Sequence, residues 1–316
     1  MNKQYKLLIL IIGITALLWL GHTPNISVDK LVNKYSNHES EFVSNEQGLK
    51  VHFRDEGESD ASAIVLLHGN SNSLHAFEPL VKELKDDYRL ISLDFPGHGL
   101  TGAHPNNQYD VEGLSQAVEL VVKHLALEDF TLLGHSMGGR VAWRYAVNHP
   151  EQLSSLVLVS ASGMPPRQGD PKKELGIGFK LLQSPVGPYL SAYTMPRITV
   201  QKSTEASMFK KDLVTDVLID QFWELLRHPQ NRKALAHRAH VKRDLTKADL
   251  ANNIKAPTLL IWGEKDTFVP PSSTISFAER IKNTKTLLIP EVGHMPMLEA
   301  TETTAKAIRD FLKVNL

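Results

Sequence analysis

Ser136 has the sequence surroundings of a catalytic nucleophile. It lies in the hexapeptide GHSMGG at positions 134–139, which contains the pattern G-x-S-x-G. The apolar run FTLL precedes this hexapeptide, and the helical pattern MGGRVAWRYAV begins at its fourth residue. Glycines permit a sharp turn between a strand and a helix, and such a turn projects the serine oxygen from the end of the strand. The pattern predicts a nucleophile at Ser136, and the alternative is a structural tight turn.

A serine hydroxyl is a weak nucleophile, so it needs a base, and the base needs an orienting carboxylate. His294 follows the apolar run TLLIP, and Asp266 follows the apolar run TLLIW. Both residues come directly after predicted strands, at the edge of the sheet where Ser136 is also expected. The chain order Ser136, Asp266, His294 is one of the known orders of a Ser-His-Asp triad. Glu264, two residues before Asp266, is the competing carboxylate.

The oxyanion that forms when the serine attacks a carbonyl needs two backbone N–H donors. We expect one donor to be the amide of Met137, at the start of the helix. The other is expected in the loop His68-Gly69-Asn70, which follows the apolar run AIVLL, with the amide of Asn70 as the best candidate.

The remaining chain alternates between strand and helix patterns, which predicts an α/β fold with a doubly wound, mainly parallel sheet. The first of these patterns, Lys50–Arg54, is expected to be an early edge strand. The other predicted strands are 63–67, 88–93, 130–133, 156–160, 258–262 and 286–289, and the predicted helices are 74–84, 111–125, 136–148, 272–281 and 303–316.

Residues 163–253 interrupt this alternation and carry only helical patterns, such as 211–227 and 232–243. A helical insertion between two strands of the sheet is expected to form a cap above the strand ends, where open α/β sheets bind their ligands. Phe222 and Trp223 are the cap residues that we expect to contact substrate, and the alternative is that they pack in the core of the cap itself. A basic cluster lies on a predicted helix of the insertion and comprises His237, Arg238, His240, Lys242 and Arg243. We expect these side chains to form a solvated face, and the alternative is that they contact anionic lipid headgroups.

Composition excludes several classes of function. The chain has 316 residues, with 35 Lys and Arg, 35 Asp and Glu, and no cysteine. A formal net charge of zero argues against nucleic acid as a partner. The absence of cysteine excludes thiol catalysis and a disulfide scaffold. We expect no metal, because no H-E-x-x-H motif occurs, and no cofactor, because the predicted serine mechanism implies none.

The amino terminus has the pattern of a membrane-targeting segment. Lys3 and Lys6 precede an apolar run over residues 7–20, which is shorter than a typical transmembrane helix. We expect residues 1–22 to be an uncleaved signal anchor or a cleaved signal peptide, followed by a tether or short helix over 23–40. Either reading places the catalytic domain, residues 41–162 and 254–316 with the cap, outside the cytoplasm, anchored to a membrane or secreted.

Five spaced motifs resemble those of the α/β-hydrolase superfamily: HGN at 68–70, DFPGHG at 94–99, GHSMGG at 134–139, WGEKD at 262–266 and GHMPMLE at 293–299. The chain is most similar to its capped serine esterases and lipases of the monoacylglycerol-lipase type, some of which carry an amino-terminal anchor. The resemblance implies Ser136 as nucleophile, His294 as base and Asp266 as its orienter. It also implies oxyanion donors at Asn70 and Met137, and a structural role for the DFPGHG loop.

The resemblance leaves several activities open. The expected function is cleavage of carboxylic esters, with a lipid-like or monoacylglycerol substrate. Carbon–carbon bond hydrolases keep the same triad and a similar cap, as do cofactor-free haloperoxidases and thioesterases. A non-catalytic, membrane-tethered binding protein is the alternative outside the enzymes. The chain lacks the HGGG loop of many lipases, which argues against bulky tertiary-alcohol or triglyceride substrates.

Overall fold

The computed structural model describes residues 5, 21–171, 180, 182–241 and 244–315. Within these residues the chain forms one eight-stranded sheet in the order β1-β2-β4-β3-β5-β6-β7-β8. Pairing is antiparallel for β1 with β2 and for β2 with β4, and parallel for every other pair. The strands are β1 (Ser40–Ser44), β2 (Lys50–Glu56), β3 (Ala63–Leu67), β4 (Arg89–Leu93), β5 (Phe130–His135), β6 (Leu153–Val159), β7 (Thr258–Gly263) and β8 (Thr284–Ile289).

The central strands are mostly apolar because both faces of the sheet are covered. All five residues of β3, AIVLL, are buried, as are all six of β7, TLLIWG. Two separate apolar clusters result, one on each face of the sheet. The helices packed on the first face are α4 (Val111–His124), α5 (Met137–Asn148) and α11 (Ser273–Ala278); those on the second are α3 (Glu78–Leu84), which follows η1 (Leu74–Phe77), α12 (Pro296–Glu299) and α13 (Thr301–Asn315). The predicted fold class is therefore confirmed.

The prediction of an edge strand at Lys50–Arg54 is wrong, because β1 lies outside β2. Only Val43 of β1 is buried, so the strand has almost no hydrophobic pattern in the sequence. Its position is set by antiparallel pairing with β2, in register from Ser40 with Arg54 to Ser44 with Lys50.

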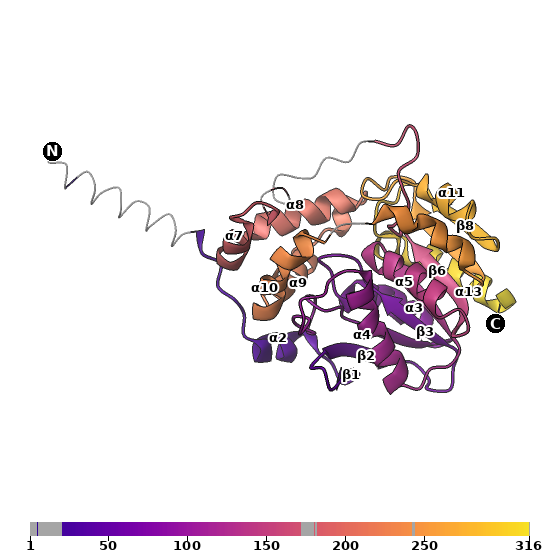
Figure 1. Ribbon diagram of the computed structural model, residues 1–316, viewed down its shortest axis with the longest axis horizontal. Helices are drawn as coiled ribbons and strands as arrows, with labels where there is room; N and C mark the ends of the chain where they lie inside the picture. Colours follow the sequence, from indigo (N-terminus) through magenta and orange to yellow (C-terminus); the bar gives the residue numbers. More distant parts are fainter. Residues whose placement is uncertain (1–4, 6–20, 172–179, 181, 242–243, 316) are drawn as a thin grey trace.

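The described part of the insertion 163–253 contains helices and no strand, as expected. Figure 1 shows α7 (Gly187–Tyr193), α8 (Arg197–Ser207), α9 (Asp216–Leu226) and α10 (Pro229–Ala239) grouped together at one side of the molecule. The insertion also contains two 3-10 helices, η2 (Lys211–Leu213) between α8 and α9, and η3 (Leu245–Asn253), which packs against α5 of the core. It joins the sheet through β6 and β7.

The segment expected to be a tether or short helix contains α2 (Val28–Tyr35) and packs against both the sheet domain and the cap. Leu31 and Tyr35 are buried in an apolar cluster with Leu100 of the core and Leu225 of α9. Backbone hydrogen bonds also run from Thr23 to Tyr193 and from Ile26 to Arg227.

The apolar run 7–20 lies outside the described residues. Among those described, no helix has the length and hydropathy needed to span a bilayer.

Candidate active site

Ser136 occupies the turn between β5 and α5. Its backbone has φ 53° and ψ −110°, a conformation that non-glycine residues rarely adopt. The turn is anchored from both sides, because Ser136 N–H donates to Val159 O at 3.0 Å and its carbonyl accepts from Ser162 N–H at 2.9 Å. The side chain is partly accessible.

Two glycines of the G-x-S-x-G pattern are required by close approach of the backbone. A Cβ atom on Gly134 would lie 2.4 Å from the carbonyl oxygen of Gly138, and one on Gly138 would lie 2.1 Å from the carbonyl oxygen of Leu67. Neither site has room for a side chain, so helix α5 can start directly against the ends of β3 and β5.

The structure brings Ser136, His294 and Asp266 together in one hydrogen-bonded chain. His294 Nε2 lies 2.9 Å from Ser136 Oγ, and His294 Nδ1 lies 2.8 Å from Asp266 Oδ2. Asp266 follows β7 and His294 follows β8, while Ser136 follows β5. These three strands are parallel members of one sheet, so their carboxyl ends meet at the same edge.

Asp266 is buried and keeps its negative charge. Burial works to raise its pKa, but the charge and hydrogen bond of His294 outweigh burial and lower the pKa below its ordinary value. Its other oxygen accepts from the backbone amides of Phe268 at 2.8 Å and Val269 at 2.9 Å. The competing carboxylate, Glu264, is exposed, so geometry favours Asp266.

Sequence reasoning missed two rings that hold His294. His135 Nε2 donates to the backbone carbonyl of His294 at 2.8 Å, and burial lowers the pKa of His135 to about 3, so that it stays neutral. Phe268 stacks on the imidazole of His294 with ring centroids 5.3 Å apart. His135 is the variable residue before the serine in G-x-S-x-G, so the pattern gave no reason to select it.

Glu299 was also missed, although it ends the motif GHMPMLE. Its buried carboxylate accepts from the amides of Gly293 and Met295, which flank His294, at 3.0 and 3.2 Å. It also accepts from the amides of Phe209 and Lys210 in the insertion, at 2.7 and 3.0 Å. One carboxylate therefore joins the histidine loop to the cap.

Loop 68–70 reaches Ser136, and His68 sets the orientation of its peptide groups. A Cβ atom on Gly69 would lie 3.3 Å from Ser136 Cβ. His68 Nδ1 donates to Gly69 O at 2.7 Å, and its Nε2 accepts from Phe95 N–H at 3.0 Å. Burial lowers the pKa of His68 to about 4, which keeps the neutral form that this pairing needs. In a trans peptide C=O and N–H point in opposite directions, so fixing Gly69 O also fixes the N–H of Asn70.

Met137 is the first residue of α5, so its N–H has no partner within the helix. It adjoins Ser136 directly, on the strand edge that also carries loop 68–70.

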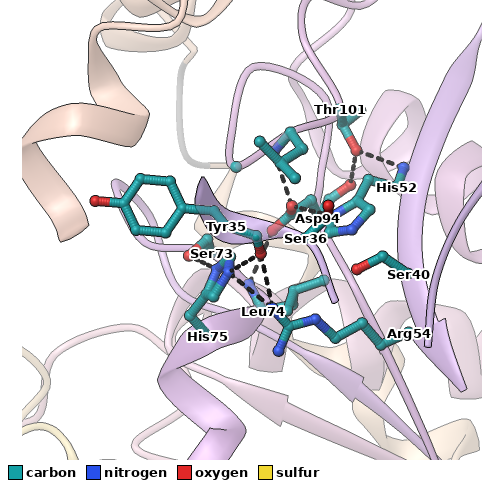
Figure 2. Close-up of polar contacts among 12 residues, drawn as sticks. Tyr35, Ser36, Ser40, His52, Arg54, Ser73, Leu74, His75, Asp94 and Thr101 are labelled. Atoms are coloured by element: carbon teal, nitrogen blue, oxygen red, sulfur yellow. Dashed lines mark hydrogen bonds and ion pairs between the residues drawn. The ribbon is translucent and has the colours of Figure 1, made fainter. Parts of the chain in front are cut away.

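Asp94 joins β2, the start of η1 and its own loop through hydrogen bonds, of which Figure 2 labels those to His52 and Leu74. It accepts from His52 Nδ1 at 2.7 Å and from the amides of Leu74 and Leu100 at 2.8 Å each. Burial works to raise the pKa of Asp94, but the hydrogen bond and the charge of His52 outweigh burial and hold the pKa well below its usual range. No part of Asp94 is accessible to solvent, which agrees with a structural role for the DFPGHG loop.

The two predicted substrate contacts lie in different surroundings. Phe222 is buried beside the loop after β3, where it lines a cavity of about 10 Å³ with Ser71 and His98. The Trp223 indole donates to Met195 O at 2.6 Å within the cap, and Trp223 does not line this cavity.

The prediction of a solvated face is wrong for Arg238 of the basic cluster. Its guanidinium donates to Gly97 O at 2.7 Å and to Asn70 Oδ1 at 2.6 Å, so it joins α10 to two loops of the core. His237 and His240 are exposed, and Lys242 and Arg243 lie outside the described residues. Within the described part of the chain, no group of three or more acidic or histidine side chains is placed to hold a metal ion.

Comparison with known proteins agrees with this architecture. Residues 62–183 and 204–301 match the model of the α/β hydrolase fold family, and the chain belongs to this family. It is therefore a hydrolase of the α/β-hydrolase fold.

Relatives of the chain include proteins named as dienoate hydrolases and proteins named as monoacylglycerol lipases. It is 28% identical to a 2-hydroxy-6-oxo-6-phenylhexa-2,4-dienoate hydrolase of Burkholderia cepacia over 289 residues, which cover 86% of this chain and 96% of that protein. It is 28% identical to monoacylglycerol lipase abhd6-B of Xenopus laevis over 257 residues, which cover 79% of this chain and 75% of the lipase. A crystal structure of a membrane phospholipase A, described as a bacterial virulence factor, superposes with a TM-score of 0.74 at 23% identity, over 99% of this chain and 98% of the other.

Proposed function

We propose that the protein is a serine hydrolase that cleaves carboxylic esters, with lipid-like or monoacylglycerol esters preferred. The observation that carries the proposal is the hydrogen-bonded chain Ser136–His294–Asp266 at the open edge of the sheet. Similarity to a monoacylglycerol lipase supports the choice of ester substrates.

The geometry supports a two-step reaction. Ser136 Oγ attacks the ester carbonyl while His294 Nε2 takes the hydroxyl proton, and the negative charge of Asp266 stabilises the imidazolium. The amides of Asn70 and Met137 donate to the oxyanion, an interaction worth about 3 kcal/mol per donor in such sites. His294 then gives the proton to the leaving alcohol. Water, activated by the same histidine, releases the acid and restores Ser136.

A carbon–carbon bond hydrolase is the second candidate, because the dienoate hydrolase is as similar in sequence and is matched over 96% of its length. The two candidates separate in one experiment. We expect p-nitrophenyl and monoacylglycerol esters to be hydrolysed, and vinylogous diketones of the dienoate type to be turned over negligibly. The opposite result would replace the ester proposal by the second candidate.

The cap supplies the acyl site in this proposal. Each buried methylene contributes about 0.8 kcal/mol, so kcat/KM is expected to rise over the first few acyl carbons and to fall once the chain exceeds the pocket. Phe222 lines the same small cavity as Ser71, the residue that follows the proposed oxyanion loop. Phe222→Ala should therefore move the preferred chain length, whereas an unchanged optimum would place the acyl chain elsewhere.

We further propose that residues 1–22 target the protein, as an uncleaved anchor or a cleaved signal, with the catalytic domain outside the cytoplasm. The support is the basic start and apolar run of the sequence alone. Carbonate-resistant membrane fractionation of the full-length protein would indicate an anchor, and a shortened soluble product would indicate cleavage.

A further inference from the structure

Arg238 is a cation without an acidic partner beside the proposed oxyanion loop. Its Nη1 donates to Gly97 O, and its Nη2 donates to Asn70 Oδ1 and, at 3.5 Å, to Ser71 Oγ, all of them uncharged oxygens. Its Nε is buried and has no hydrogen-bond partner, and no ion pair of Arg238 occurs among the described residues. Buried charges in proteins are normally paired, because removing an unpaired charge from water is costly.

The groups around Arg238 leave its charge uncompensated. Burial lowers the pKa of His68 to about 4 and holds that of His98 well below its ordinary value, so both rings are neutral. Asp94 is the buried carboxylate of this region, and His52 and two backbone amides already occupy it. Burial lowers the pKa of Arg238 to about 9, which still leaves a cation at neutral pH.

Arg238 reaches solvent only on the side of Asn70. The residue is half-buried and its Nε is buried, but Asn70 is exposed, and so is its hydrogen bond with Nη2 of Arg238. Asn70 follows Gly69, whose backbone lies against Ser136. A ligand group bound at Nη2 of Arg238 would therefore lie beside Asn70, and the preceding residue of the loop, Gly69, contacts the proposed nucleophile.

We propose that Arg238 binds an anionic group of the substrate, a carboxylate or a phosphate, carried a few bonds from the scissile ester. Guanidinium groups bind both anions through paired N–H donors, and the bond is stronger than one to a neutral oxygen. The substrate class is then an anionic monoacyl ester rather than a neutral one. This inference rests on the ester hydrolase function proposed above.

The test compares matched esters with and without the anion. On the acyl side, p-nitrophenyl hemiglutarate is paired with p-nitrophenyl hexanoate; on the alcohol side, 1-oleoyl lysophosphatidic acid is paired with 1-oleoylglycerol. Arg238→Gln should lower the ratio of anionic to neutral kcat/KM by about 10- to 100-fold in at least one pair, the range of a charge-assisted hydrogen bond. The responding pair identifies the position of the anion. Arg238→Lys should restore part of the ratio.

Lys233→Gln is the matched control, because it removes an exposed charge from the same helix and should leave both ratios unchanged. If Arg238→Gln lowers anionic and neutral turnover equally, the residue only braces the oxyanion loop and the proposal is overturned. An equal loss of the ratio in Lys233→Gln would also overturn it, because a general charge effect would then suffice.

A binding measurement keeps this inference separate from the proposed hydrolysis. Non-hydrolysable 1-O-alkylglycerol phosphate and neutral 1-O-alkylglycerol are titrated calorimetrically, below their micellar concentrations, into the full chain and into Arg238→Gln. Tighter binding of the phosphate that is lost in Arg238→Gln supports the inference even if no ester is hydrolysed. Equal binding of the two lipids by the unsubstituted protein contradicts it, even if neutral esters are good substrates.

Discussion

The triad, at the carboxyl ends of the parallel strands, and the helical cap are held in place in different ways. Ser136, Asp266 and His294 each follow a parallel strand of the same sheet, and backbone hydrogen bonds fix their positions. The cap is joined to the rest of the molecule mainly by side chains, chiefly Arg238, Asn231, Gln230 and Glu299, and by Tyr35 of α2. A backbone hydrogen bond also joins the two regions, from His294 N–H to Ser207 O at 2.7 Å. Substitutions of the triad and of the residues that position it should therefore reduce kcat. Substitutions of the side chains that hold the cap should instead alter KM and the choice of substrate.

The largest effect is expected at the orienting carboxylate. Asp266→Asn should lower kcat by about 10⁴-fold, because the imidazole loses the partner that sets its tautomer and stabilises its charge. Glu264→Gln is the control, since Glu264 is exposed, and steady-state ester kinetics measure both variants. A greater loss in Glu264→Gln would show that the wrong carboxylate has been assigned.

His68 comes next, and two substitutions separate its two hydrogen bonds. Asn places its amide near the position of Nδ1 and can still donate to Gly69 O, whereas Gln mimics Nε2 and can only replace the bond with Phe95. His68→Gln should lower kcat by about 10²-fold, the typical loss of one oxyanion donor, and His68→Asn by clearly less. Equal losses in variants of equal thermal stability would mean that the orientation of the Asn70 peptide does not depend on His68.

At Glu299, stability and KM should change together. Gln has a single acceptor oxygen, so Glu299→Gln leaves some of the four amide donors around this position unpaired, at about 1–3 kcal/mol each. We expect a lower midpoint of thermal unfolding and a raised KM, read from calorimetry and chain-length kinetics. A stable variant with unchanged KM would show that the cap is held without this carboxylate.

The smallest effect is expected at α2. Tyr35→Phe removes only the hydroxyl that donates to Glu224 Oε2 at 2.8 Å, and retains the backbone carbonyl that accepts from Arg54 and His75 (Figure 2). Loss of one hydrogen bond should cost about 1 kcal/mol in the free energy of unfolding and raise KM slightly. Lys34→Ala, which removes an exposed partner of the same carboxylate, should change both by less. A larger effect of Lys34→Ala would show that the ion pair of Lys34 with Glu224, and not the hydroxyl of Tyr35, holds α2 against α9.

The residues at the carboxyl ends of the strands could be predicted from the sequence, whereas most of the contacts around them could not, and the reason is physical. Buried parallel strands are continuous apolar runs, and the residue that follows each run must lie at the carboxyl edge, so the places of Ser136, Asp266 and His294 could be predicted. β1 could not, because it buries one side chain and is defined by pairing.

The residues that hold the cap against the core could not be predicted from the sequence, for a related reason. Arg238 lies in a basic stretch of the kind that usually faces solvent. Its side chain instead points toward the core because of tertiary contacts with Gly97 and Asn70, which no local sequence pattern records. Glu299 and His135 bind backbone groups of residues that are distant in the chain, namely Phe209 and Lys210 for Glu299 and His294 for His135. Their roles depend on geometry, and residue type alone does not reveal them.

Mapping of a covalent phosphonate adduct tests the central claim most directly. After reaction with a fluorophosphonate, peptide mass spectrometry should find the adduct on Ser136 of the full-length protein. Ser136→Ala should remain folded, as judged by circular dichroism, and carry no adduct. Labelling that persists in folded Ser136→Ala, or an adduct on another residue of the unsubstituted protein, would contradict the assignment of Ser136 as the nucleophile.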